Sequence, residues 1–135
     1  MQTLLILVLA LVGAAGSYLT NERPEPIELI QDAWMRTPED VAGLGAVLWV
    51  DARNVDQYHV GHIEGAVNVS LQDWDIGLGE LLTVWSPEQD IVVYCDGEGC
   101  ALSRETAEKL RADLATDNIY WLQGGIQAWE EFTLR

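Results

Sequence analysis

Cys95 is the residue whose type and position most clearly suggest chemistry. It ends the apolar run Ile91–Tyr94 and precedes a glycine-containing segment, 96–100, after which the chain has the pattern of a helix over about 102–114. Backbone N–H groups at a helix N-terminus, and the partial positive charge of that end, favour a thiolate over a thiol. The glycines allow successive amides of the loop to point at one spot. We therefore predict that Cys95 is a reactive nucleophile.

A second set of polar residues follows another apolar run, 46–50. Asp51 and Arg53 come directly after it, and His62 lies in a glycine-containing stretch further on. Asp51 and Arg53 are either catalytic or a structural ion pair that fixes the end of the strand, and we prefer the structural interpretation. His62 is either a proton shuttle or a hydrogen-bonded turn residue, and the turn residue is the simpler interpretation.

The cysteines and histidines do not predict a metal site. The chain has two of each, too few for a convincing four-ligand zinc site, so we expect no metal and no cofactor. Cys95 and Cys100 are five positions apart. They could form a disulfide across the loop, or Cys100 could be a second thiol beside the first.

The charge of the chain excludes one class of partner. Its 135 residues are enough for one domain, and 22 acidic residues against 7 Lys and Arg give a net charge of −15. Binding to nucleic acid depends on clustered Lys and Arg that release counterions from phosphates. We therefore predict that nucleic acid is not a partner.

The first residues differ from the rest of the chain. Residues 4–19 carry no charge, and with 1–3 they make a stretch that would span roughly 30 Å as a helix, the thickness of a bilayer core. A signal peptide is the alternative, but no Lys or Arg precedes Arg23. We predict a transmembrane anchor over 1–20, a proline-containing linker over 21–26 and a domain over 27–135. Arg23 is the one base near this stretch, so the positive-inside rule has little to count. We expect the domain on the extracytoplasmic side.

The pattern after the linker alternates between helices and strands. The predicted strands are 46–50, 66–69, 91–94 and 118–122. The predicted helices are 27–36, a short one capped by Thr37 with Pro38 at its first position, 54–60, the second half of 71–84, 102–114 and 126–131. This alternation predicts an α/β fold, a parallel sheet with helices on both faces. Because sites in such sheets form at the carboxyl ends of strands, we expect Asp51, Cys95 and Gly124 to share one edge.

Three stretches together resemble a known family. Residues 50–53 with 58–68 (VDAR and YHVGHIEGAVN), Tyr94-Cys95 before a helix, and 122–129 (LQGGIQAW) resemble, in order and spacing, the motifs of rhodanese-like domains. The resemblance covers about 27–132. It implies a five-stranded parallel sheet flanked by helices.

The resemblance also implies an activity and a site. Rhodanese-like sulfurtransferases carry a cysteine that accepts a sulfane sulfur from a small donor such as thiosulfate and passes it to a thiol or other thiophilic acceptor. Carried over, Cys95 is the nucleophile and persulfide carrier. The persulfide would be held by amides of the loop that follows it: Asp96, Gly97, Glu98, Gly99, Cys100 and Ala101.

The loop departs from the common pattern of the family. Common sulfurtransferase loops carry Arg or Lys beside the cysteine, whereas Asp96 and Glu98 here would raise the pKa of a thiolate and repel thiosulfate. Arg104 is the nearest base in sequence and offsets part of this charge. Phosphatase and arsenate reductase relatives need Cys-x5-Arg, and Ala101 occupies that arginine position, so no fork of donors would clamp an oxyanion.

Two functions follow from the resemblance and the apolar segment. The first is a membrane-anchored sulfurtransferase of the thiosulfate:cyanide type that uses a Cys95 persulfide. The alternative is a catalytically weak rhodanese-like accessory or assembly subunit of a membrane protein complex. A third interpretation is a thiol–disulfide switch through Cys95 and Cys100, which suits an oxidising compartment.

Overall fold

The computed structural model describes residues 32–97, 99 and 101–135. The predicted anchor over 1–20 and the linker over 21–26 lie outside this part of the chain. Within the part described, no helix is both long enough and apolar enough to cross a bilayer.

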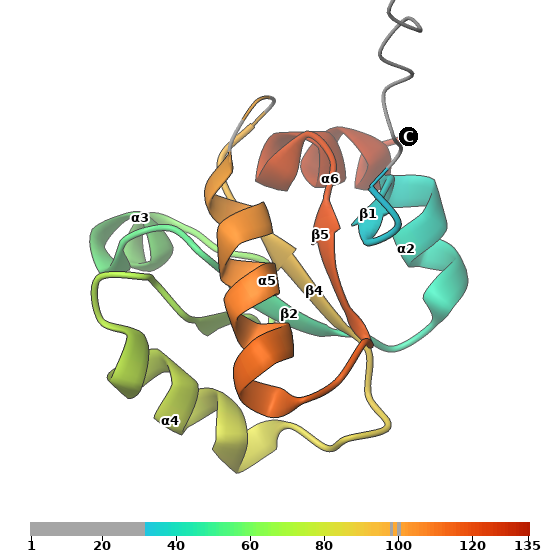
Figure 1. Ribbon diagram of the computed structural model, residues 1–135. Helices are drawn as coiled ribbons and strands as arrows, with labels where there is room; N and C mark the ends of the chain where they lie inside the picture. Colours follow the sequence, from blue (N-terminus) through green and yellow to red (C-terminus); the bar gives the residue numbers. More distant parts are fainter. Residues whose placement is uncertain (1–31, 98, 100) are drawn as a thin grey trace, which may run out of the picture. The chain divides into compact units, whose positions relative to one another are not determined.

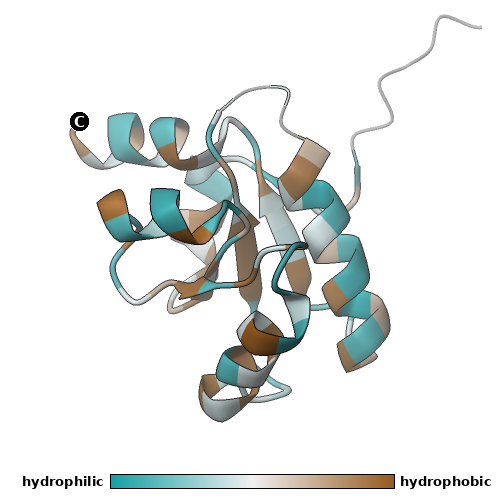
Figure 2. Cartoon of the chain, turned by 90° about the vertical axis from the view of Figure 1, so that its left-hand side faces the viewer, coloured by the Kyte–Doolittle hydropathy of each residue, from teal (hydrophilic) through white to brown (hydrophobic). Residues whose placement is uncertain are grey.

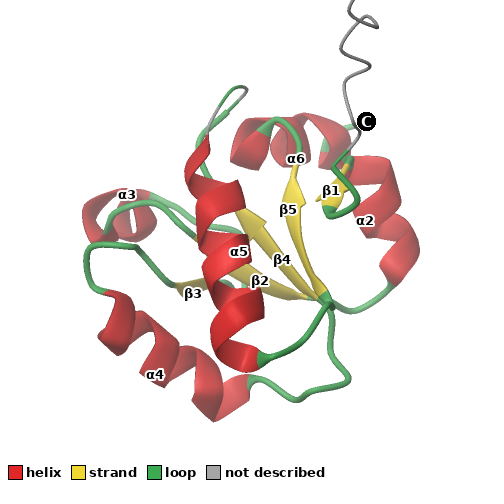
Figure 3. Ribbon diagram, in the orientation of Figure 1, coloured by secondary structure: helices red, strands yellow, loops and turns green. Residues whose placement is uncertain are grey.

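The described chain contains one sheet of five strands, and every adjacent pair is parallel (Figures 1 and 3). The strands lie in the order β1-β5-β4-β2-β3, so β4 is at the centre, between β5 and β2. Their bounds are β1 (Met35–Arg36), β2 (Leu48–Asp51), β3 (Val67–Asn68), β4 (Ile91–Tyr94) and β5 (Ile119–Leu122). The predicted α/β fold with a five-stranded parallel sheet is confirmed.

Helices cover both faces of the sheet, as the alternating pattern predicts (Figure 3). Residues of α4 and α5 pack into one apolar cluster, and residues of α2, α3 and α6 pack into the other. The bounds are α2 (Pro38–Leu44), α3 (Val55–Val60), α4 (Trp74–Val84), α5 (Ala101–Leu114) and α6 (Gly125–Thr133).

The central strands are apolar on both faces because helices bury both. Successive side chains of a strand point to opposite faces. In β4, Ile91 and Val93 therefore join the cluster under α4 and α5, whereas Val92 and Tyr94 join the other cluster. Figure 2 shows hydrophobic residues along the strands, and hydrophilic and hydrophobic residues alternating along the helices.

The helix predicted for 27–36 is wrong over its described part. Met35 and Arg36 form edge strand β1, paired with Trp121 and Leu122 of β5. A turn at Asp32 leads into it: the side chain of Asp32 accepts a hydrogen bond from the Trp34 N–H, and its carbonyl accepts one from the Met35 N–H. Pairing with an open strand edge satisfies backbone groups that a surface helix would satisfy internally, and the apolar pattern alone does not separate the two.

The other helix starts follow local rules. The predicted cap of α2 is confirmed, because Thr37 accepts from the Asp40 N–H and the Asp40 carboxylate accepts from the Thr37 N–H. Helix α4 begins earlier than predicted, at Trp74, whose indole N–H donates to Asp113 on α5 at 3.0 Å. Lys109 of α5 lies over the same indole ring, 4.6 Å from its centre. These contacts bring the first turn of α4 against α5.

Candidate active site

The carboxyl ends of three strands place the chemically capable residues at one edge of the sheet. Asp51 at the end of β2 is in register with Tyr94 at the end of β4, and Val93 is in register with Trp121 of β5. Cys95 follows Tyr94 directly. The side chains of Cys95 and Tyr94 point to opposite faces, so this edge has two distinct sides.

Cys95 lies on the side of the sheet covered by α5. Its side chain is almost completely buried, at 2% exposure. Its sulfur lies 3.5 Å from the hydroxyl oxygen of Ser103, in the first turn of α5, within hydrogen-bonding reach. The sulfur is disulfide-bonded in this structure. A nucleophilic Cys95 therefore requires prior reduction by a thiol.

The N-terminus of α6 fixes the start of the Cys95 loop. The Ile126 N–H donates to the Cys95 carbonyl at 2.9 Å, and the Gln127 N–H donates to the Asp96 carbonyl at 3.4 Å. In a trans peptide the N–H points away from the C=O of the same peptide unit. The N–H groups of Asp96 and Gly97 therefore point away from α6.

This close approach requires glycine at the start of α6. A Cβ on Gly125 would lie 2.6 Å from the Cys95 carbonyl oxygen and 2.7 Å from the Asp96 carbonyl oxygen, both backbone atoms. Gly125 also has φ +61°, and Gly124 before it has φ +76°, values that side chains disfavour. The Gly124-Gly125 pair thus lets the helix reach the loop.

The Asp96 side chain contacts Arg53 and Gln57, a residue of α3. Its carboxylate accepts a hydrogen bond from the Gln57 amide at 2.9 Å and lies 3.5 Å from the Arg53 guanidinium. The side chain is 56% exposed, so solvent also screens it. The repulsion of an anionic donor that the sequence predicts at Asp96 is therefore offset in part by Arg53.

The other loop residues contribute little side-chain chemistry. Gly97 lies near the side-chain oxygen of Gln127, Gly99 has φ +72°, and Ala101 begins α5. Glu98 and Cys100 lie outside the described residues.

Asp51, Arg53 and Tyr94 form a hydrogen-bonded network on the opposite side of the sheet from Cys95. Asp51 is fully buried, at 0% exposure, and its carboxylate accepts from the Arg53 guanidinium at 2.7 Å and from the Tyr94 hydroxyl at 2.8 Å. The hydrogen bond to Asp51 raises the pKa of Arg53, and burial raises the pKa of Tyr94. Arg53 also donates to the Gly61 carbonyl. The network ties together the ends of β2 and β4 and the turn after α3.

His62 lies in that same turn. Its ring stacks on Tyr58 at 3.8 Å between centres, and its Nδ1 lies 2.8 Å from the Tyr58 carbonyl oxygen. These contacts are local, and they orient the ring within the turn.

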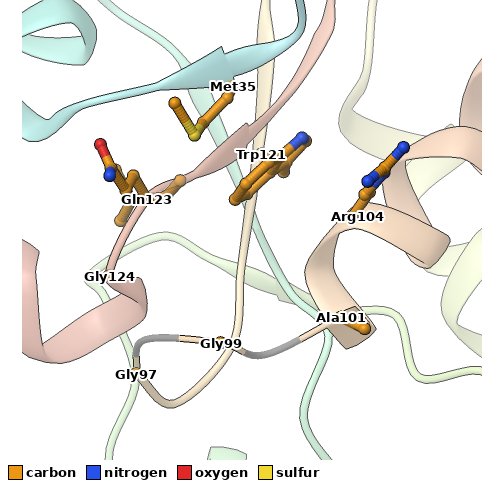
Figure 4. Close-up of a pocket in the computed structure, with 9 residues that line it drawn as sticks. Met35, Gly97, Gly99, Ala101, Arg104, Trp121, Gln123 and Gly124 are labelled. Atoms are coloured by element: carbon orange, nitrogen blue, oxygen red, sulfur yellow. The ribbon is translucent and has the colours of Figure 1, made fainter. Parts of the chain in front are cut away.

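A cavity of about 480 Å³ borders the Cys95 loop on the α5 side (Figure 4). Its walls come from β1, β5, the start of α5 and the loop. The lining residues are Met35, Gly97, Gly99, Ala101, Arg104, Trp121, Leu122, Gln123 and Gly124.

Asp32 organises one wall of this cavity. One of its carboxylate oxygens accepts from the Trp121 indole N–H at 3.0 Å and lies 3.3 Å from Nε of Arg104. Partial burial raises the pKa of Asp32, but hydrogen bonds from the Trp34 N–H and the Trp121 indole, together with the charge of Arg104, outweigh it and leave the pKa below its usual value of 3.8.

Sequence reasoning finds Arg104 but misses the rest of this wall. Trp121 is detectable in principle, because alternation along 118–122 sets it on one face of its strand. Met35 and Asp32 give no such signal, because the sequence around them predicts a helix. Within the described ranges, no cluster of three or more His, Cys, Asp or Glu side chains could hold a metal ion.

A comparison with protein families finds one family model in this chain, the rhodanese-like domain, over residues 37–132. The match spans α2 to α6 and includes the Cys95 loop. It covers more than half of the 135 residues.

Two curated relatives share part of the sequence. The HTH-type transcriptional regulator Rv0324 of Mycobacterium tuberculosis is 32% identical over 63% of this chain, and the match spans only 35% of the regulator. The thiosulfate sulfurtransferase GlpE of Shewanella oneidensis is 28% identical over 61% of this chain and 74% of its own.

Among solved structures, a rhodanese-related protein from Thermoplasma volcanium superposes with a TM-score of 0.55. The match covers 73% of this chain and 91% of that one, at 23% identity. Identity at this level supports the fold alone.

Proposed function

Because the chain belongs to the rhodanese-like domain family, we propose that it transfers sulfane sulfur through a persulfide on Cys95. The observation that supports this most is the position of Cys95 at the end of β4, followed by a loop whose first two carbonyls are bound by α6. In this proposal the N–H groups of Asp96 and Gly97, which point away from α6, stabilise the negative charge of the terminal persulfide sulfur.

The proposed transfer has two steps. The Cys95 thiolate attacks the outer sulfur of thiosulfate, so that a new S–S bond forms and the old one breaks to release sulfite. A thiophilic acceptor such as cyanide or a thiolate then attacks the outer persulfide sulfur. The acceptor leaves with that sulfur, and the Cys95 thiolate is regenerated.

Reduction is the first requirement of this cycle. Cys95 is disulfide-bonded in this structure, and a disulfide sulfur has no thiolate to attack a donor. A dithiol must reduce it before the first turnover. We therefore expect the oxidised chain to be inactive and the reduced chain to be active.

The test uses the full chain, reduced with dithiothreitol and then freed of it. We expect thiosulfate and cyanide to give thiocyanate with the reduced protein, and none with Cys95→Ser. Cys100→Ser should still form thiocyanate, because a persulfide needs only one cysteine and serine keeps the backbone amide at position 100. The proposal fails if the folded, reduced chain gives no Cys95-dependent thiocyanate with any sulfane donor.

A second candidate function is thiol–disulfide exchange, which the disulfide at Cys95 favours. This activity requires both cysteines, whereas sulfur transfer requires only Cys95. Equilibration with glutathione buffers, followed by counting of free thiols, tests it. Loss of disulfide exchange with glutathione in both Cys95→Ser and Cys100→Ser supports thiol–disulfide exchange. Loss of thiocyanate formation in Cys95→Ser alone supports sulfur transfer.

An accessory role is the outcome that remains if no donor is turned over. The near-complete burial of Cys95 favours it, because a donor must reach a side chain that is 2% exposed. Co-purification of the catalytically silent chain with a membrane protein complex would support this role.

We further propose that residues 1–20 anchor the domain in a membrane, on its extracytoplasmic side. The uncharged stretch over 4–19 supports the anchor, and the side is the part that the protease test decides. Membrane fractionation of the full chain, compared with a chain lacking residues 1–31, tests the anchor. Protease accessibility of the domain in sealed vesicles tests the side.

A further inference from the structure

Helix α4 carries apolar residues on its outer side as well as its inner side. Trp74, Leu78 and Leu81 pack into the apolar cluster that α4 shares with α5. Ile76 and Leu82 belong to the same helix, yet they are 68% and 51% exposed. A helix that is apolar all round is typical of one that is covered on every side. The described residues cover only the inner side of α4, which lies at the lower edge of the domain in Figure 1.

The exposed residues form a continuous stripe along α4. At about 100° per residue, Ile76, Gly79 and Thr83 follow one another along the outer side of the helix. Leu82 lies one turn from Gly79 and beside Thr83. All four are exposed, and we call them the outer stripe. The Thr83 hydroxyl donates to the Glu80 carbonyl at 2.6 Å, so the polar group of this side chain is already hydrogen-bonded.

The two glycines of α4 differ in what surrounds them. A Cβ on Gly77 would lie 2.7 Å from the Asn68 carbonyl oxygen and 2.8 Å from the Val69 Cα, so this glycine lets α4 lie close on the end of β3. A Cβ on Gly79 would have no heavy atom of the described residues within 4 Å. Glycine inside a helix is destabilising relative to alanine. Packing within the domain explains Gly77 but not Gly79, where bare backbone is open to the side chain of a partner.

The charge around the outer stripe is of one sign. Residues 70–90 include five Asp and Glu and no Lys, Arg or His. Asp75 and Glu80, both exposed, lie on either side of the centre of the stripe. Lys109 of α5 lies over the Trp74 ring of α4, and it is paired with a carboxylate of its own helix. An apolar stripe between carboxylates is complementary to an apolar surface that carries cations.

We propose that the outer stripe is a docking site for an amphipathic helix of a partner protein, whose apolar face is flanked by Lys and Arg. The apolar side chains of that helix cover Ile76 and Leu82 and reach the bare backbone at Gly79. Its basic side chains pair with Asp75 and Glu80. Binding at this face needs no chemistry at the active-site cysteine, so the proposal goes beyond sulfur transfer and is tested apart from it.

The same charges disfavour two other occupants of the stripe. A second copy of the chain would bring two acidic segments together, each with five carboxylates over 70–90. An anionic lipid surface attracts Lys and Arg and repels carboxylates. A cationic helix is instead attracted by the net charge of −15, and this attraction weakens as salt screens it.

The binding test uses the full chain and two fluorescein-labelled peptides of about 18 residues with helical spacing, one of Leu and Lys and one of Leu and Glu. We expect the Leu-Lys peptide to bind at least about tenfold more tightly than the Leu-Glu peptide. Its affinity should fall about threefold or more when NaCl is raised from about 50 to about 300 mM. Equal affinity for the two peptides would overturn the proposal.

Two pairs of variants separate the outer stripe from general attraction to an acidic protein. The double variant Ile76→Asn, Leu82→Asn should weaken the Leu-Lys peptide about tenfold or more. Val60→Asn, at an apolar residue of α3 that is 92% exposed, should change the affinity by less than about twofold. Glu80→Gln should weaken binding about threefold, and Glu130→Gln, the same charge change on α6, by less than about twofold. A double variant that behaves like Val60→Asn would overturn the proposal.

Two further measurements test the other occupants. A dimer of the full chain in sedimentation velocity, lost in the double variant, would assign the stripe to a second copy. Protection of 76–83 from hydrogen exchange in phosphatidylcholine vesicles without any peptide, compared with detergent, would assign it to the membrane. Either result would overturn the proposal, whereas protection of 76–83 that requires the Leu-Lys peptide supports it.

Discussion

Two arginine–carboxylate pairs lie on opposite sides of the sheet near the carboxyl end of β4, and they differ in burial and surroundings. The Asp51–Arg53 pair lies on the α3 side, with Asp51 fully buried, Arg53 nearly so and Tyr94 completing its hydrogen bonds. The Asp32–Arg104 pair lies on the α5 side, with Arg104 57% exposed and a cavity beside it. The first pair holds the backbone together, whereas in the second Arg104 stays exposed and also pairs with Glu108 at 3.0 Å. A charge pair serves structure or recognition according to how fully its partners enclose it.

Removing Asp51 should have the largest effect on stability. Asp51→Ala leaves the Arg53 guanidinium and the Tyr94 hydroxyl without their buried acceptor, and we expect a loss of about 3–5 kcal/mol in the free energy of unfolding. Urea denaturation of the two proteins measures it. A loss below about 1 kcal/mol would mean that the buried Asp51–Arg53 pair contributes no more to stability than the exposed Asp32–Arg104 pair.

Gly125→Ala should disturb the Cys95 loop more than the fold. The new Cβ would meet the Cys95 and Asp96 carbonyl oxygens at 2.6 and 2.7 Å, so either α6 or the loop must move. We expect a loss of about 1–3 kcal/mol in stability and a larger proportional loss of thiocyanate formation.

Gly79→Ala is the matched control, because Gly79 lies inside α4 with open space around it. That variant should gain about 0.5–1 kcal/mol, since alanine favours a helix. Equal activity of the two variants would contradict the account of the loop.

Asp32→Asn should have a smaller effect that depends on pH. The pKa of Asp32 is lowered in the folded chain, so its contribution is complete above its usual value of 3.8 and is lost as pH falls through the lowered value. The difference in unfolding free energy between wild type and Asp32→Asn should therefore be constant from pH 5 to 7, at about 1 kcal/mol or less, and shrink below about pH 4. A difference that grows on acidification would reverse the assigned direction.

Asp96→Asn should have the smallest effect. The carboxylate is exposed and already faces Arg53 and Gln57, so we expect a change in stability within about 0.5 kcal/mol. We expect KM for thiosulfate to change by less than about threefold. A fall of tenfold or more would identify Asp96 as the main electrostatic barrier to the donor.

The motifs around Asp51, Cys95 and Gly125 carry strong local signals, and that part of the fold is predictable from sequence. Apolar runs that end in chemically distinctive residues mark the carboxyl ends of strands, and glycine pairs mark close backbone approach.

The wall of the cavity could not be predicted from local sequence patterns. Asp32 and Met35 belong to a segment whose helical pattern is overridden by pairing with β5, and no local rule predicts a partner about ninety positions away.

The direction of the Asp96 side chain cannot be predicted from its neighbours in the sequence either. Its sequence position beside Cys95 predicts repulsion of an anionic donor. The contacts with Arg53 and Gln57 arise only because β2 and β4 are neighbours in the sheet. Charge counted along a loop is therefore a poor guide to the charge that a ligand meets.

The most direct test of the central claim is the mass of the reduced chain after incubation with a sulfane donor. If Cys95 carries the persulfide, the chain gains one sulfur atom on the peptide that contains Cys95. Cyanide removes this sulfur again, and Cys95→Ser does not gain it. A folded, reduced chain that gains no sulfur at Cys95 from thiosulfate or any other sulfane donor would contradict the proposed persulfide.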